Sequence, residues 1–194
     1  MIKNILNELR ISVIATVCLA VLLCGIYPAV VWGIAQGLFH SQANGSLVEV
    51  QGQVIGSSLL AQSFTGAGYF HPRPSAAGDG YDAVSSGGSN LGPTSQKLIA
   101  AGKERVAAYR AENKLAPEVL IPADAVTASA SGLDPNISVK NALLQASRVA
   151  RVRGVGEEAL RKMIVSRTKG RDLGIFGEPR VNVLLLNLDM DGDK

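Results

Sequence analysis

The sequence lacks charged side chains over one long stretch near its start, and this absence is its most informative feature. No Asp, Glu, Lys or Arg occurs from Ile11 to Phe39, in a chain of 194 residues. About 20 consecutive apolar residues cross the hydrocarbon core of a bilayer, where each charged side chain costs a few kcal/mol. The sequence therefore predicts a transmembrane helix over residues 11–36, a cytoplasmic tail over residues 1–10 and an extramembrane domain over residues 37–194.

A cleaved secretory signal peptide is the alternative interpretation of this run. Such a peptide has an apolar core of about 7–15 residues before a small-residue cleavage site. The run is about twice that length, and Tyr27 and Trp32 lie in its second half, where aromatic residues favour the headgroup boundary. The pattern favours an uncleaved anchor, which Pro28 either kinks or ends because proline lacks a backbone donor.

Basic residues are also missing after the apolar run. Lys3 and Arg10 precede the run, whereas the next basic residue is Arg73. Cytoplasmic flanks are enriched in Lys and Arg, so the N-terminus is predicted to lie in the cytoplasm. The domain is then periplasmic, or extracytoplasmic in general, and the lipid bilayer is a partner of the chain.

Cysteine, histidine and catalytic motifs are scarce. Both cysteines, Cys18 and Cys24, lie inside the apolar run at a spacing that places them on different helix faces, which excludes a disulfide between them. There is no phosphate loop, H-E-x-x-H or C-x-x-C motif. Asp189, Asp191 and Asp193 indicate an acidic tail more than a calcium loop, because the glutamate required at position 12 is absent. We therefore expect no catalytic residue, no metal site and no autonomous enzyme.

An excess of one charge is likewise absent from the domain. From Ser41 onward the chain has 17 basic and 15 acidic residues, a net charge of +2. The interval from Arg148 to Arg171 is locally basic, with eight Arg or Lys residues against Glu157 and Glu158. This pattern fits the solvated faces of two helices, or a patch for anionic lipid headgroups or an acidic partner. Nucleic acid is not expected as a partner, because aromatic residues do not interleave with these charges.

The remaining pattern predicts an α+β domain with a small sheet and about three helices. Residues 47–50 and 54–55 flank Gln51-Gly52-Gln53 as in a β-hairpin, and residues 66–93 form a long loop rich in Gly, Pro and Ser. Thr94 and Ser138 are predicted N-caps of helices that extend to about Asn113 and over residues 139–150, and a third helix is predicted over residues 157–168. Residues 181–188 are predicted to form a strand inside the sheet, because they are apolar on both faces.

Two segments of the long loop are candidate functional sites. The hydroxyls and backbone N–H groups around Ser86, Gly87, Gly88, Ser89 and Asn90 could surround a phosphate, although the same residues also form simple tight turns. Gly88 is a position where a positive φ would require glycine.

The other segment is Tyr69-Phe70-His71-Pro72-Arg73-Pro74-Ser75, whose prolines favour a rigid extended backbone. This backbone suits a docking surface formed by Tyr69, Phe70, His71 and Arg73, or equally a segment packed over the sheet. For His71 we expect a hydrogen-bonded structural role.

Five motifs in order, together with the N-terminal anchor, resemble a known family. They are Asn44-Gly45-Ser46-Leu47, Tyr69-Phe70-His71-Pro72-Arg73-Pro74-Ser75-Ala76, Ser86-Gly87-Gly88-Ser89-Asn90-Leu91-Gly92-Pro93, residues 126–135 and Gly177-Glu178-Pro179-Arg180-Val181-Asn182-Val183. The chain resembles the C subunit of the bacterial high-affinity potassium-transporting (Kdp) P-type ATPase. It departs from the family pattern at Ala61, where glycine is usual, and at Asn136, where histidine is usual.

This resemblance implies a non-catalytic subunit of the bacterial inner membrane. Its partners would be a channel-like potassium-translocating subunit and an ATP-hydrolysing subunit, and its role that of a catalytic chaperone that raises the ATP affinity of the latter. It implies no tightly bound cofactor, and ATP only through the hydrolysing subunit. The family motifs add Gln62 to the nucleotide candidates and Asp134, Glu178 and Arg180 to the docking candidates.

The predicted topology conflicts with a direct role in ATP binding. ATP is cytoplasmic, whereas the flanking charges place the domain outside the cell. A domain on that side would act indirectly, by stabilising the assembly or by capping the potassium entrance. An independent membrane-anchored protein that binds an extracytoplasmic ligand is the alternative from another functional class.

Overall fold

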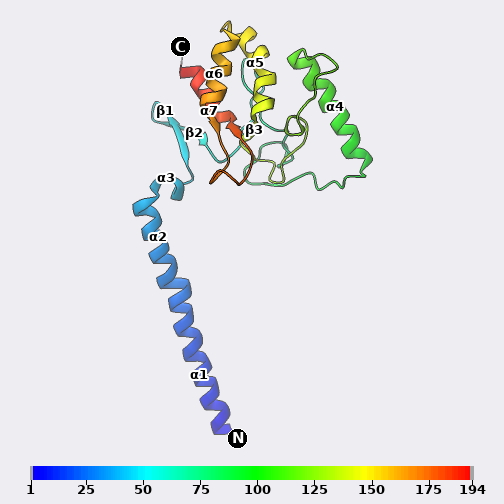
Figure 1. Cartoon of the computed structure of the whole chain (residues 1–194). Helices are drawn as coiled ribbons and strands as arrows, with labels where there is room; N and C mark the ends of the chain where they lie inside the picture. The colour runs from blue at the N-terminus through cyan, green and yellow to red at the C-terminus, as the bar shows by residue number, and fades with distance from the viewer. Residues whose placement is uncertain (1, 193–194) are drawn as a thin grey trace. The chain divides into compact units, whose positions relative to one another are not determined.

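The computed structural model describes residues 2–192 (Figure 1). The chain divides into two compact units, Met1–Leu47 and Val48–Lys194. The first unit is almost entirely helical: α1 spans Ile2–Ala20, a π-helical segment spans Val21–Ile26, α2 spans Tyr27–Leu38, and the short α3 spans His40–Ala43. Within this unit, Asn4–Leu38 is long and apolar enough to cross a membrane, consistent with the predicted anchor.

Pro28 does not end the apolar helix, which continues through it with a change in hydrogen-bond pattern. The π-helical segment lies immediately before the proline, and the Tyr27 N–H donates to the Leu22 carbonyl five residues earlier. Proline occupies the first turn of α2, where its missing N–H group removes no bond of that helix. The widened turn is therefore the local adjustment to Pro28, and the apolar helix continues to Leu38.

The second unit contains two small antiparallel sheets. The predicted hairpin is confirmed: β1 (Leu47–Val50) pairs with β2 (Gln53–Ser57). Gln51 and Gly52 between them have φ values of 52° and 79°, the positive values that a two-residue type I′ turn requires. The other sheet has the order β3-β5-β4, formed by Asn136–Ser138, Arg180–Asn182 and Thr168–Lys169.

Four helices of more than one turn lie in this unit rather than about three. They are α4 (Gln96–Asn113), α5 (Val139–Arg153), α6 (Glu157–Ser166) and α7 (Val183–Gly192), with a 3-10 turn, η2, at Ala123–Ala125. Ser138 caps α5 as predicted, accepting from the Asn141 N–H at 3.1 Å. The cap of α4 is Ser95 rather than Thr94, and it accepts from the Leu98 N–H.

The predicted strand over residues 181–188 is wrong beyond Asn182. Val181 does lie in the central strand of the sheet, paired with Ile137 on one side and Thr168 on the other. The chain then turns into α7, whose Leu185 N–H is capped by the Asn182 side chain at 3.1 Å. Because the run is apolar on every face, it fits both the two-residue repeat of a strand and the 3.6-residue repeat of a helix. The capping side chain of Asn182 favours the helix.

The core lies between the three-stranded sheet and helices α5, α6 and α7, which gather on one side of the unit (Figure 1). The predicted apolar stripe of α5 faces this core, with Ala142, Ala146 and Val149 fully buried. Residues 58–95, all of them described, form no helix or strand. This long segment nevertheless inserts Phe70, which is 0% exposed, into the core.

Candidate docking surfaces and nucleotide loop

The extended segment from Tyr69 to Arg73 is held by buried amide side chains instead of a neighbouring strand. Asn187 of α7 accepts from the Phe70 N–H at 2.8 Å and donates to the Phe70 carbonyl at 2.9 Å. Gln145 of α5 bonds both backbone groups of His71 in the same way, at 2.7 and 3.1 Å. Each side-chain amide supplies one donor and one acceptor. The amide therefore takes the place of the backbone hydrogen bonds that an adjacent strand would make.

A buried arginine completes this support. Arg148 of α5 is 2% exposed, and its guanidinium donates to the carbonyls of Ala67 and Tyr69 and to the side chains of Asn113 and Gln145. Burial lowers the pKa of Arg148, and the carboxylate of Glu112, 3.6 Å away, counteracts this effect. Since a buried charge is tolerated only when it is hydrogen-bonded, these contacts fix the loop to α4 and α5.

The ring of His71 has a structural environment, as expected. Its Nδ1 atom lies 3.0 Å from Glu112 Oε1, and its Nε2 atom lies 3.1 Å from the Gly66 carbonyl. Burial, followed by the positive charge of Arg148, lowers the pKa of His71, while Gly66 and Glu112 oppose the shift. Among residues 2–192, no group of three His, Cys, Asp or Glu side chains gathers to hold a metal ion.

A cavity of about 300 Å³ opens between the long loop, α4 and α5, and His71 and Glu112 line it. Tyr109, also in its wall, donates to Asn141 Oδ1 at 2.7 Å, and Asn141 donates to Asp124 at 3.0 Å. Burial raises the pKa of Tyr109, which keeps the phenol protonated as a donor. No buried side-chain N or O atom within the described range lacks a hydrogen-bond partner, so this network stabilises a fixed shape.

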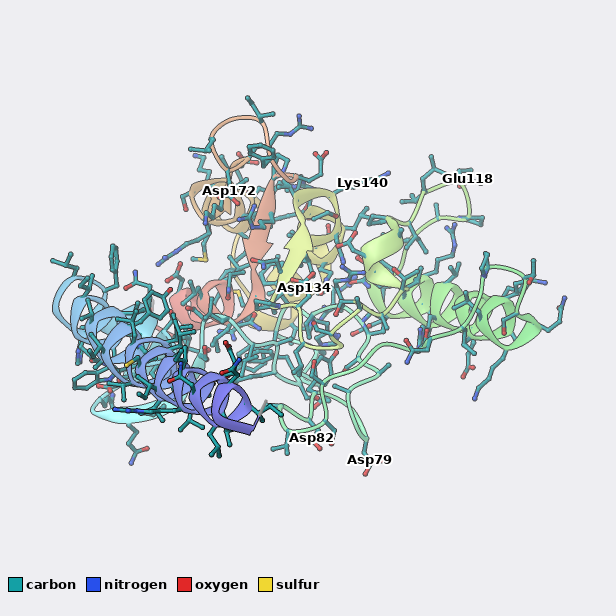
Figure 2. All side chains as sticks on the ribbon, turned by 90° about the horizontal axis from the view of Figure 1, so that it is seen from below. Asp79, Asp82, Glu118, Asp134, Lys140 and Asp172 are labelled. Atoms are coloured by element: carbon teal, nitrogen blue, oxygen red, sulfur yellow. The ribbon has the colours of Figure 1, made fainter. Side chains whose placement is uncertain are left out.

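Four of the docking candidates meet at a second cavity of about 300 Å³, lined by Arg73, Asp134, Glu178 and Arg180. Arg73 Nη1 pairs with Asp134 Oδ2 at 3.1 Å, and Asp134 lies beside the three-stranded sheet (Figure 2). The backbone N–H and side-chain amide of Asn136 donate to Asp134 Oδ1 at 3.0 and 3.2 Å. Asn136 thus supports the carboxylate that binds Arg73.

The aromatic docking candidates are packed inside the domain. Phe70 belongs to the core, as described above. Tyr69 is half-buried beneath the guanidinium of Arg153, which lies 4.6 Å from the ring centroid, and its hydroxyl donates to Asp191 at 3.1 Å. Their contacts therefore stabilise the fold, whereas Arg73, Glu178 and Arg180 offer polar atoms at the rim of a cavity.

The candidate nucleotide loop uses part of its hydrogen-bonding capacity inside the domain. The Gly87 N–H and the Ser86 hydroxyl both donate to the Ser131 carbonyl, at 2.9 and 3.0 Å. Gly88 does not have a positive φ, so the condition under which its backbone would require glycine is not met. A Cβ at Gly88 would lie 3.0 Å from the Ala130 carbonyl oxygen, so close backbone approach is the physical reason.

The other members of the nucleotide set lie in different surroundings. Ser89 and Asn90 are exposed, and Asn90 has a φ of 51°. Gln62 donates to the Ile55 carbonyl of β2 at 3.0 Å, and its amide occupies the space where a side chain at Gly56 would be. Gln62 is thus engaged with the β1–β2 sheet, and no contact joins it to Ser86–Asn90 among the hydrogen bonds of the described residues.

The basic interval Arg148–Arg171 forms internal ion pairs rather than one continuous patch. Arg153 pairs with Asp191 and Arg161 with Glu157, at 2.9 and 2.6 Å. Arg167 pairs with Asp189, and Arg171 with Glu178. This distribution disfavours a single anionic-lipid patch, because carboxylates pair with four of the arginines in the interval.

Sequence reasoning missed the buried polar residues that position the loop, namely Asn141, Gln145, Arg148 and Asn187. The sequence does contain one signal for them. Asn141, Gln145 and Arg148 are spaced four and three residues apart in α5, so they lie on the same helix face as its buried alanines. Polar residues at such core positions indicate that another backbone segment needs hydrogen bonds there.

An apolar helix long enough to span a membrane, joined to an α+β domain, is consistent with a membrane-anchored protein. The sequence matches the family described as "KdpC: K+-transporting ATPase, c chain" over residues 9–192. The chain belongs to this family, and it is a subunit of a potassium-transporting ATPase.

Named relatives agree over nearly the whole length. The potassium-transporting ATPase KdpC subunit of Mycobacterium tuberculosis (strain ATCC 25618 / H37Rv) is 53% identical over 97% of this chain and 98% of its own. The corresponding subunits of Nitratidesulfovibrio vulgaris and Koribacter versatilis are 54% and 49% identical, over 96% and 98% of this chain and 94% and 95% of theirs. The family that the five motifs predicted is therefore confirmed.

Proposed function

We propose that this chain is a non-catalytic accessory subunit that stabilises an ATP-driven, high-affinity potassium import complex. Its partners are a channel-like potassium-translocating subunit and an ATP-hydrolysing subunit. The observation that carries the proposal is the Asn4–Leu38 helix, which has no charged residue from Ile11 onward and whose most apolar window has no residue buried within the chain. Small residues along it, Ala15, Ala20, Gly25, Ala29 and Gly33, allow partner helices to approach closely.

The domain acts indirectly on ATP hydrolysis in this proposal. The positive charges before the helix favour a cytoplasmic N-terminus and an extracytoplasmic domain, away from ATP. The hydrogen bonds from Ser86 and Gly87 to Ser131 support the same view, because these donors are already engaged within the domain. Any increase in the ATP affinity of the hydrolysing subunit then comes from a change in the assembled complex.

Purification of the complex with and without this chain tests the role. We expect the other subunits to dissociate or lose potassium-stimulated ATPase activity when the chain is omitted, and to regain activity when it is co-expressed. A photoreactive ATP analogue should label the hydrolysing subunit and leave this chain unlabelled. Nucleotide-protected labelling of this chain would replace indirect action with direct ATP contact.

Thiol labelling in intact cells tests the predicted side of the membrane. With Cys18 and Cys24 replaced by alanine, Val84→Cys supplies one accessible thiol, since Val84 is 96% exposed beside the candidate loop. A membrane-impermeant maleimide should label this variant before lysis. A cysteine introduced at Asn7, before the apolar run, should be labelled only after lysis, and the reverse pattern would place the domain in the cytoplasm.

The alternative function, an independent extracytoplasmic binding protein, predicts a chain that is monodisperse alone and binds a ligand unaided. Nothing in the two 300 Å³ cavities favours it over the subunit role, because Arg73, Asp134, His71 and Glu112 pair within them. Size-exclusion chromatography of the detergent-solubilised chain, alone and co-expressed with its partners, separates the two functions.

A further inference from the structure

The three-stranded sheet has one apolar face and one polar face. Residues that pair directly across antiparallel strands point to the same face, and neighbours along a strand point to opposite faces. Val181 pairs with Ile137 of β3, and both side chains are buried in the core. The opposite face therefore carries the residues on either side of them and the partners of those residues, which are Asn136, Ser138, Lys169, Arg180 and Asn182.

Neighbouring segments turn part of this polar face into a cavity of about 470 Å³. The Asn182 side chain donates to the Ser58 carbonyl at 2.7 Å, which ties the segment after β2 to the sheet. The end of α6 at Ser166 and Leu185 of α7 also line the cavity. Of its nine lining residues, Leu185 is the one apolar member. The cavity is therefore large enough for a small molecule and suits a polar one.

The charged residues in the lining are all basic, namely Arg167, Lys169 and Arg180. The carboxylates that pair with them, Asp189 and Asp172, lie outside the lining. Arg180 donates to Asp172 through Nη2 at 2.8 Å, and within residues 2–192 its guanidinium makes no other hydrogen bond. Lys169 Nζ lies 3.4 Å from Asp172, beyond the usual length of a hydrogen bond. Both side chains thus retain donors for a ligand in the cavity.

We propose that this cavity binds a soluble phosphate dianion, held by Arg167, Lys169 and Arg180. The planar guanidinium groups match the oxygens of a phosphate, and the lysine adds a compact positive charge. Two negative charges against three positive ones leave the occupied lining with a net charge of +1. A lipid phosphate fits less well, because its acyl chains need adjoining apolar surface and Leu185 alone supplies it here. The site goes beyond the accessory-subunit role and does not depend on it.

A bound phosphate has a structural consequence for the domain. Arg167 follows α6, Lys169 belongs to β4 and Arg180 to β5, so one ligand would link these three parts of the chain. Because a ligand that binds only the folded form raises its stability, phosphate should stabilise the domain.

Isothermal titration of the detergent-solubilised full chain with inorganic phosphate, at constant ionic strength, measures the binding. Lys169→Gln should weaken it about tenfold, the usual effect of losing a hydrogen bond to a charged group. Lys169→Arg keeps the charge and should bind nearly as tightly as the wild type. Lys140→Gln is the matched control, because it removes the same charge from an exposed position at the start of α5, outside the cavity (Figure 2). The control should bind phosphate as the wild type does.

Acylation of lysines in the wild-type chain, followed by mass spectrometry, gives a measurement that needs no variant. Inorganic phosphate should slow the acylation of Lys169, whose side chain is 68% exposed, and leave that of Lys140 unchanged. Chloride at equal ionic strength should slow neither.

Three results would overturn the proposal. They are the absence of phosphate binding to the wild type, equal phosphate affinity of the wild type and Lys169→Gln, and equal protection of Lys169 and Lys140. A fourth concerns the source of the phosphate group. If the chain in lipid nanodiscs loses phosphate binding when phosphatidylglycerol replaces phosphatidylcholine, a lipid headgroup occupies the cavity and the soluble ligand is excluded.

Discussion

At the scale of single residues, Arg148 joins three parts of the domain that are distant in sequence. Its guanidinium binds the long loop at Ala67 and Tyr69, α4 at Asn113, and its own helix at Gln145. The loop has no strand partner here, so these bonds and the two amide pairs fix its backbone. The energetic consequence of removing such a group is the cost of leaving its acceptors buried and unpaired.

Arg148→Met should therefore destabilise the domain by about 3 kcal/mol or more, because several buried acceptors lose their donor while the apolar stem is kept. Thermal unfolding of the detergent-solubilised chain, followed by circular dichroism, measures the change. Arg151→Met on the same helix is the control, since Arg151 is exposed and should shift stability by less than about 0.5 kcal/mol. Equal shifts for the two variants would contradict the role of Arg148.

Gly132 provides a second test at this scale. Its φ is 68°, and a Cβ there would lie 2.7 Å from both the Ala77 nitrogen and the Gly87 carbonyl oxygen. Gly132→Ala should lower the free energy of unfolding by about 1–3 kcal/mol through backbone strain. The loss should be larger if the long loop at Ala77 and Gly87 cannot move away from the new Cβ. Gly87→Ala, which meets nothing within 4 Å, should be nearly neutral in the same unfolding measurement. A neutral Gly132→Ala would show that the loop and residues 129–132 are not tightly packed.

At the scale of elements, the features predicted correctly are those that depend on residues close together in the sequence. The β1–β2 hairpin, the Ser138 cap and the stripe of α5 each follow from a few neighbouring residues, and the structure confirms all three. The last element was predicted as a strand because Val183 to Leu188 is apolar apart from Asn187. Five residues of α7 are buried, and four of them, Val183, Leu186, Asn187 and Met190, follow helical spacing, which becomes visible only when the run is read to its end.

Asn182 tests what determines the change from strand to helix. Its side-chain oxygen caps α7 at the Leu185 N–H, and its side-chain nitrogen donates to the Ser58 carbonyl at 2.7 Å. Asn182→Ala should cost about 1–2 kcal/mol, the usual range for losing an N-cap. Asn182→Asp keeps the capping oxygen but loses the donor to Ser58, so in thermal unfolding it should fall between the wild type and Asn182→Ala. If the Ala and Asp variants unfold alike, the cap is not the stabilising contact.

At the scale of the whole molecule, the parts that could not be predicted depend on contacts between distant positions. Gln145 and His71 are 74 positions apart, and Asn187 and Phe70 are 117 apart. No local pattern predicts that two amide side chains will form hydrogen bonds with the backbone groups of a proline-rich loop. The docking candidates illustrate the same limit, because the motifs identified Tyr69 and Phe70 without showing that both rings pack inward. The side of the membrane on which the domain lies stays a prediction from charge alone.

His71 links these distant segments to the dependence of stability on pH. It faces Glu112, Tyr109 and Arg105 from α4, Arg148 from α5 and Tyr81 from the long loop. Burial and Arg148 lower its pKa below the ordinary value of 6.5. Between that value and the lower pKa of the folded state, the unfolded chain binds the proton and the folded chain does not. The contribution of His71 to the stability should therefore be constant above about pH 6.5 and fall as the pH falls below it.

Thermal unfolding at several pH values between 7.5 and 5, for the wild type and His71→Gln, measures this dependence. Glutamine retains hydrogen-bonding atoms at the position but cannot titrate. The melting temperature of the variant should therefore fall by less than that of the wild type over this pH range. The lowered pKa values of Glu157 and Asp172 add their own loss of stability only at more acidic pH, where those carboxylates are protonated. A wild type that gains stability as the pH falls from 7 to 5.5 would mean that Glu112, rather than burial, determines the protonation of His71. Parallel curves for the two proteins would show that His71 does not titrate differently in the folded and unfolded states.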